Sequence, residues 1–256
     1  PWSSAGAVLD RVHLLLLGSS MAEAAEAAAA ARARRNQRTF QVLFASALFN
    51  ACTVCSTLTV RPELVARVLG NDPALIGKTT ANWLAAGSAL QLLVAPTLGK
   101  MSDAFGRKPV LLLGAIVSLA LRIAAMLRPT YWPLALEKIV PQGINYYSQW
   151  AVANAAIADL TETTEELAST FGTFMSYLGI GTLLSPLVSA QVITMTGNPV
   201  HAYTTCAVWN ALLILTYVTS FTETLPKEKR REFLGSLGLP FSAFSALGIL
   251  RTASAS

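Results

Sequence analysis

The chain has 256 residues, of which 53% are hydrophobic and only 13% are charged, and its formal net charge is +5. Soluble domains carry about 25% charged residues, so this composition argues against a soluble globular protein. The lysines and arginines gather beside apolar runs, as a membrane surface selects, so we expect a lipid bilayer and no nucleic acid as a partner. We find no phosphate-binding glycine loop, nucleophile elbow or zinc-ligand spacing, and predict no enzyme activity, cofactor or metal site.

Residues 1–38 are predicted to form an N-terminal cytoplasmic tail. The apolar run at 12–17 is too short to cross a bilayer, and an alanine-rich stretch with arginines follows it at 22–35. A segment that is rich in alanine and arginine and poor in acidic residues is also typical of an organelle transit peptide. Met21 offers an alternative start, in which case the residues before it would be a non-native leader.

Six apolar runs follow, and each is long enough to cross the hydrocarbon layer as a helix. They cover residues 39–60, 79–98, 109–127, 132–158, 167–195 and 200–222. The fourth run contains several polar side chains, which we expect to face the interior of the bundle because lipid does not solvate them. The sequence therefore predicts an all-α, polytopic membrane protein with a six-helix bundle at 39–226 and a cytoplasmic segment at 227–256.

A charged decamer, 99–108, separates the second run from the third and is predicted to form a tight hairpin at the membrane surface. Gly99 and Gly106 would allow a sharp backbone path. Pro109 suits the first turn of the next helix, where a missing N–H group costs nothing. Arg107 and Lys108 would anchor that helix at the cytoplasmic face.

The spacing Q-x-x-x-A-P-x-x-G-x-x-S-D-x-x-G-R-K-P-V-L runs from Gln91 to Leu111. It resembles the loop between helices 2 and 3 of the major facilitator superfamily, especially of its tetracycline-efflux-like branch. The resemblance implies that the six helices form one half of a major facilitator fold, and that the second, carboxy-terminal half of a twelve-helix protein is missing. It also implies a conformational gate at the cytoplasmic face, formed by Gly99, Asp103, Gly106, Arg107 and Lys108.

A second likeness lies in the fifth run, where Gly181, Ser185, Pro186 and Ser189 are similar to the antiporter motif of the family's helix 5. Small residues replace three of its glycines, and they still permit close helix approach beside a proline bend. The alternative is a packing face with no bearing on antiport. In the first run, Asn50 falls where tetracycline-type antiporters carry a titratable aspartate, so we predict it to be a hydrogen-bonding substrate contact.

Polar residues at helical spacing in the fourth run are the main substrate-binding candidates, although they are equally suited to hydrogen bonds between helices. They are Gln142, Asn145, Tyr146 and Gln149, with Gln91 in the second run as a weaker candidate. Glu137 and Arg122 both lie toward the outer ends of their helices and are expected to pair. Together with Lys138, which stands near the family's helix-4 arginine, they form either a coupling site or a structural ion pair.

The distribution of arginine and lysine predicts a multi-pass integral membrane protein with both ends in the cytoplasm, and it leaves open which membrane. The resemblance implies secondary active transport of a small solute by alternating access, with this chain as a fragment of the transporter. The alternative function is that of a non-transporting, six-helix binding or regulatory protein that dimerises through its small-residue faces. The substrate, the direction of transport and the coupling ion stay open.

Overall fold

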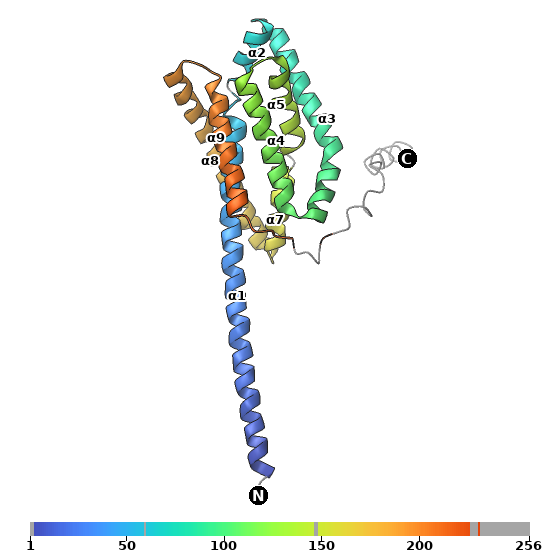
Figure 1. Cartoon of the computed structure of the whole chain (residues 1–256), viewed down its shortest axis with the longest axis vertical. Helices are drawn as coiled ribbons and strands as arrows, with labels where there is room; N and C mark the ends of the chain where they lie inside the picture. The colour runs from blue at the N-terminus through green and yellow to red at the C-terminus, as the bar shows by residue number, and fades with distance from the viewer. Residues whose placement is uncertain (1–2, 59, 146–147, 226–229, 231–256) are drawn as a thin grey trace, which may run out of the picture. The chain divides into compact units, whose positions relative to one another are not determined.

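The computed structural model describes residues 3–58, 60–145, 148–225 and 230, with side chains from residue 26 onward. The chain divides into two compact units, Pro1–Gln41 and Val42–Ser256. All regular secondary structure in the described ranges is helical (Figure 1). The predicted all-α class is therefore confirmed.

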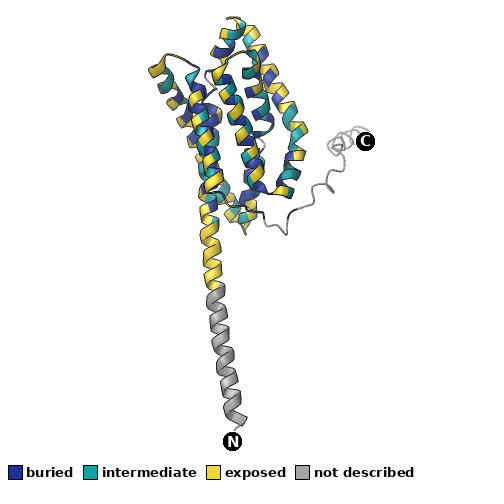
Figure 2. Ribbon diagram, viewed as in Figure 1, coloured by how far each residue is buried: buried dark blue, intermediate teal, exposed yellow. Residues whose placement is uncertain are grey.

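The first unit consists of the beginning of α1, a helix that runs over Ser3–Cys55. Alanine has the highest helix propensity of any residue, which accounts for helix through the alanine-rich segment. Residues 26–35 are all exposed (Figure 2). The predicted tail thus takes a regular conformation, whereas its proposed origin as a leader or transit peptide stays a prediction.

In its described residues, the second unit contains the end of α1 and eight further helical segments. These are α2 (Arg61–Leu69), α3 (Pro73–Phe105), α4 (Arg107–Leu127), α5 (Tyr131–Gly143), the π-helix η1 (Ser148–Val152), α7 (Ala153–Leu160), α8 (Thr164–Thr196) and α9 (His201–Thr219). Within this unit α3 packs against α5, and α4 packs against both α5 and α9, while α8 packs along α9 (Figure 1).

Local sequence signals account for several of the helix ends. The Asp72 side chain caps α3 by accepting a hydrogen bond from Ala74 N at 2.9 Å, and Thr163 caps α8 by accepting from Glu166 N at 3.1 Å. Gly106, at φ +107°, ends α3 and allows α4 to begin at the next residue. This backbone conformation is nearly restricted to glycine, so Gly106 permits the reversal between the two helices.

Three helices are long and apolar enough to cross a membrane in the described ranges: α4, α8 and α9. They correspond to the third, fifth and sixth predicted runs. The other three runs fall on the end of α1, on α3 and on the α5–η1–α7 segment, where polar residues such as Asn82 and Gln91 lower the mean hydropathy. Six transmembrane helices therefore stay a prediction.

Three expectations about the course of the chain are wrong. The helix of the first run ends at Cys55, before a turn, instead of continuing to residue 60. Gly99 makes no sharp turn, because α3 continues through it to Phe105 and Gly106 alone reverses the chain. The fourth run is not one uniform α-helix, because α5 ends at Gly143 and a π-helix precedes α7.

Exposed and buried residues alternate along the helices of the second unit (Figure 2), and the exposed ones include many large apolar side chains. Large apolar side chains cover the outside, with Leu92, Leu93 and Leu183 between 72% and 74% exposed. Polar side chains such as Glu137 and Asn210 are buried inside, at 2% and 0% exposure. Exposed apolar side chains together with buried polar groups fit a lipid environment, because the bilayer solvates the apolar side chains and the bundle supplies partners to the polar groups.

Candidate functional site

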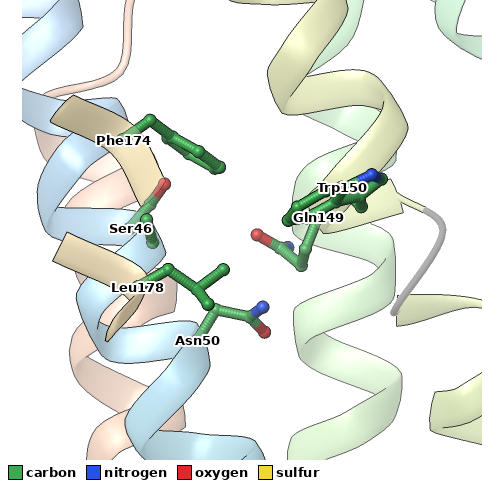
Figure 3. A pocket seen from close by; sticks show the side chains of 7 residues that line it. Ser46, Asn50, Gln149, Trp150, Phe174 and Leu178 are labelled. Atoms are coloured by element: carbon green, nitrogen blue, oxygen red, sulfur yellow. The ribbon is translucent and has the colours of Figure 1, made fainter. Parts of the chain in front are cut away.

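A cavity of about 230 Å³ opens between α1, η1 and α8 and is called the aromatic cavity below (Figure 3). It is lined by Ser46, Ala47, Asn50, Gln149, Trp150, Phe174 and Leu178. Figure 3 shows Gln149 and Trp150 facing Ser46 and Asn50 across the space. Its walls combine apolar and aromatic surface with a few polar groups, which is the usual composition of a small-molecule site.

Gln149 is held in this wall by bonds at both ends of its amide. Its Nε2 donates to Leu111 O at 3.2 Å, and its Oε1 accepts a hydrogen bond from the buried Tyr217 hydroxyl. The residue lies in η1, and π-helical turns inside helices occur frequently at functional sites because they change the direction in which side chains point. A fixed amide in a mostly apolar wall can orient a solute by hydrogen bonding.

A second, smaller cavity of about 50 Å³ contains charged groups and is called the basic cavity below. It is lined by Val54, Leu58, Arg61, Arg122, Glu137, Lys138, Pro141, Gln142 and Asn145. Arg61 Nη2 lies 2.9 Å from Glu137 Oε2, and Arg122 Nε lies 3.6 Å from Glu137 Oε1. One buried carboxylate is thus shared by two buried guanidinium groups.

Neutral partners complete this ion cluster. The Tyr203 hydroxyl donates to Glu137 Oε2 at 3.3 Å, and Arg61 Nη2 donates to Thr57 Oγ1 at 2.9 Å. With the Asn210 amide turned so that its oxygen faces Arg122, that oxygen accepts a hydrogen bond from Arg122 Nη1 at 2.7 Å. Hydrogen bonds of this kind are required where ions are removed from water, because Coulomb attraction alone does not offset their desolvation.

A hydrogen bond between two asparagines joins the linings of the two cavities. Asn145, which lines the basic cavity, donates from Nδ2 to Oδ1 of Asn50, which lines the aromatic cavity, at 3.4 Å. Asn145 Oδ1 has no hydrogen-bond partner among the described residues. The bond is long, so either amide can turn to a solute at small cost.

At the opposite end of the bundle, Arg107 forms ion pairs with two carboxylates, one of them that of the predicted gate residue Asp103. Its Nη1 lies 2.7 Å from Asp103 Oδ1, and its Nε lies 3.2 Å from Asp159 Oδ2 at the end of α7. Nη1 also donates to the buried Ser102 hydroxyl at 2.9 Å. One guanidinium therefore joins the end of α3 to the end of α7.

The same end contains two reciprocal helix caps. The Glu223 carboxylate accepts from the backbone N–H groups of Arg107 and Lys108, at 2.9 and 3.1 Å, and so caps the start of α4. Lys108 Nζ donates to Val218 O and Phe221 O, at 3.1 and 2.9 Å, and so caps the end of α9. Each ion has the sign that the helix dipole favours, so these caps lock α4 to the chain after α9.

The small residues of the fifth run form a seam between α8 and α1. Gly181, Ser185 and Ser189 are buried on one face of α8, and Pro186 lies beside them inside the helix. The Ser185 hydroxyl donates to Cys52 O at 2.5 Å. A Cβ on Gly181 would lie 2.5 Å from Leu48 O, so only glycine allows the two backbones to come this close.

The predicted site residues therefore fall into separate groups. Asn50 and Gln149 line the aromatic cavity, whereas Gln142 and Asn145 line the basic cavity, so they do not share one wall as their helical spacing suggests. Gln91 lines neither cavity, and Tyr146 lies outside the described residues. Arg122 and Glu137 do pair, and Lys138 lies in the same cavity, donating to Gln142 Oε1 at 3.2 Å.

Sequence reasoning missed Arg61, Glu223 and the aromatic residues of the larger cavity. Arg61 directly follows the first run, and this position is a signal that it can fold back against the bundle. Glu223 belongs to the sequence after the sixth run, and nothing in its surroundings predicts that it caps α4. Trp150 and Phe174 are indistinguishable in the sequence from other aromatic residues of apolar runs.

Comparison with known proteins finds related curated sequences, among them two tetracycline resistance proteins of Escherichia coli. The chain is 30% identical over 216 residues to the class C tetracycline resistance protein, covering 83% of this chain and 50% of that protein. It is 27% identical over 184 residues to the class B protein, covering 72% and 44%. The chain thus spans about half the length of these curated relatives.

A solved structure gives the same result at the level of fold. The human organic anion transporter MFSD10 (TETRAN) matches with a TM-score of 0.64 at 21% identity, covering 76% of this chain and 50% of that one. At this identity the likeness shows the fold alone. Residues 38–255 match the family model described as Major Facilitator Superfamily, which confirms the resemblance drawn from the residues between Gln91 and Leu111. The chain is therefore an integral membrane protein that belongs to the major facilitator superfamily, and it is similar to the tetracycline-efflux branch.

Proposed function

We propose that the chain is the amino-terminal half of a secondary active transporter that moves a small solute by alternating access. Family membership and coverage of about half of each relative support this proposal. The observation that carries it is a pair of cavities that contain polar side chains, with the Asn50–Asn145 bond between their linings, inside a bundle with an apolar exterior. A membrane protein gains a buried, hydrogen-bonding interior of this kind when it must bind a polar solute away from water.

The cluster of Asp103, Arg107 and Asp159 is the proposed cytoplasmic gate. Its ion pairs join α3, α4 and α7, and the Glu223 cap adds the chain after α9. Asp103 is 42% exposed at its side chain and Asp159 26%, so water can compete for these pairs and they can break and re-form. A cluster that holds one conformer and opens in the other is a suitable two-state element for alternating access.

Asp103→Asn in the complete protein tests this function. We expect the variant to insert and fold normally but to lose most of its transport, because a neutral amide no longer forms the ion pair with Arg107. Flux is measured in proteoliposomes with a panel of anionic, neutral and cationic solutes, and with the pH gradient imposed and then abolished.

Asp72→Asn is the matched control, because it makes the same chemical change at an exposed position and asparagine still caps α3. Normal flux is expected in this variant. Normal flux in Asp103→Asn as well would remove Asp103 from the gate. Absence of flux for every solute with the unsubstituted protein would argue for the non-transporting alternative.

A further inference from the structure

We propose that the transported solute is an organic anion with an apolar body, whose acidic group binds in the basic cavity and whose apolar part extends toward the aromatic cavity. The proposal rests on the proposed function and names its substrate class. It is carried by the charge of the basic cavity, its available hydrogen-bond donors and the hydrogen bond that joins the linings of the two cavities.

The basic cavity has an excess of positive charge. Its lining contains three cationic side chains, Arg61, Arg122 and Lys138, but only one carboxylate, that of Glu137. The formal charge of the lining is therefore +2. An unbalanced charge in a buried, low-dielectric site is costly, so this cavity favours the entry of an anion and opposes that of a cation.

Donors remain available for such an anion. Glu137 is already engaged by both arginines and Tyr203, but Lys138 donates to the neutral oxygen of Gln142. Arg61 Nε has no hydrogen-bond partner among the described residues, although the residue is only 7% exposed. Ammonium and guanidinium donors form their strongest hydrogen bonds with anionic oxygen atoms, such as those of a carboxylate.

The aromatic cavity supplies the apolar half of the site. Trp150, Phe174 and Leu178 line it, and Asn50 in its lining accepts a hydrogen bond from Asn145, which lines the neighbouring basic cavity. Its 230 Å³ is less than the roughly 300–1,000 Å³ of complete ligand sites, as expected if the rest of the protein forms the opposite wall. An anion with an aromatic ring can use both cavities at once.

Binding of hippurate, an aromatic carboxylate, tests the inference, with its neutral amide hippuramide as the matched ligand. Affinities are measured by calorimetry on the purified complete protein in detergent. We expect hippurate to bind and hippuramide to bind at least about tenfold more weakly, because the amide lacks the charge-assisted bonds. Lys138→Gln should lower the affinity for hippurate about tenfold, whereas Lys138→Arg should restore most of it.

Lys78→Gln is the control variant, because Lys78 is exposed on α3 and lines neither cavity. It should bind hippurate like the unsubstituted protein, and all three variants should unfold at similar temperatures. The inference is overturned if hippurate does not bind, if hippuramide binds equally well, or if Lys138→Gln has no effect.

Flux through proteoliposomes separates this inference from the proposed function. Transport of neutral or cationic solutes without hippurate binding would overturn the substrate class and leave the transporter standing. Hippurate binding without flux of any solute would overturn transport and leave the anion site standing.

Discussion

At the scale of single residues, the ion cluster around Glu137 shows how this chain keeps charge away from lipid. Glu137, Arg61 and Arg122 are at most 7% exposed, and each is bonded to a partner on another helix. Desolvating ions is expensive, so the cluster adds little net stability compared with an apolar core. Removing one member of the cluster is strongly destabilising, because the remaining charges stay buried without a counterion.

Glu137→Gln is therefore expected to lower the free energy of unfolding by about 3–5 kcal/mol, because it leaves two buried arginines without a counterion. The matched control is Glu63→Gln, which removes the same kind of Glu–Arg pair where the side chains are 53% and 56% exposed. That change should cost less than about 1 kcal/mol. Thermal unfolding in detergent measures both variants, and equal midpoints would contradict the role of the cluster.

The ion cluster around Glu137 and the Glu223 cap could be predicted from the sequence only where their contacts follow from local sequence patterns. Arg122 and Glu137 could be paired from the sequence, because each lies a similar distance from the outer end of its own run. Arg61 could not, since the pairing depends on the turn at residues 56–58 that folds it back against α5. Glu223 lies more than a hundred residues from the N–H groups that it caps, and no periodicity signals such a contact.

At the scale of helices, the apolar runs predict well where a helix lies in the sequence, but they predict poorly whether it is continuous. The third, fifth and sixth runs, which contain no charged residue other than Arg122, correspond closely to α4, α8 and α9, because length and hydropathy are sufficient to define them. The fourth run contains a π-helix, which depends on tertiary packing and leaves no mark on composition. Gly99 shows the complementary error, because glycine permits a turn without requiring one.

Substitutions in the seam between α1 and α8 test whether small residues are needed for packing there. Gly181→Ala should destabilise the protein by about 1–3 kcal/mol, because its Cβ would lie 2.5 Å from Leu48 O and 2.8 Å from Ala51 Cβ. Gly179→Ala, two residues earlier, has no atom within 4 Å of the new Cβ and should be neutral or stabilising by about 0.5–1 kcal/mol. Unfolding midpoints distinguish them, and an unaffected Gly181→Ala protein would contradict the close approach of the helices.

The turn between α3 and α4 can be tested with two glycines of similar backbone conformation. Gly106 has φ +107° and ψ 169°, and Gly70 has φ +91° and ψ 170°, so alanine at either position should cost about 1–3 kcal/mol of stability. Only at Gly106 would the new Cβ collide with the Glu223 carboxylate, which caps α4. We therefore expect Gly106→Ala to lower transport strongly and Gly70→Ala to leave it near normal at permissive temperature. Equal transport by the two variants would show that the Glu223 cap has no part in the gate.

At the scale of the whole molecule, the second unit has two chemically different ends. One end contains an apolar cluster in which Val60, Leu64, Trp83 and Tyr203 are buried together. The other end contains the ion pairs of Arg107 and the reciprocal caps of Glu223 and Lys108. The basic residues of the second end predict that it faces the cytoplasm. The helices that connect the two ends have apolar exteriors.

Which end of the bundle faces the cytoplasm can be measured by labelling the two ends of a single helix. Glu165 lies in the first turn of α8 and Asn198 just beyond its end, and both are exposed. We expect Asn198→Cys to react with a membrane-impermeant maleimide in intact cells, and Glu165→Cys to react only after permeabilisation, because both chain ends are proposed to be cytoplasmic. Cys52, Cys55 and Cys206 are buried, and replacing them by serine removes background labelling. The opposite labelling pattern would invert the topology and place the Arg107 cluster on the outer face, whereas labelling of both positions in intact cells would mean that α8 does not cross the membrane.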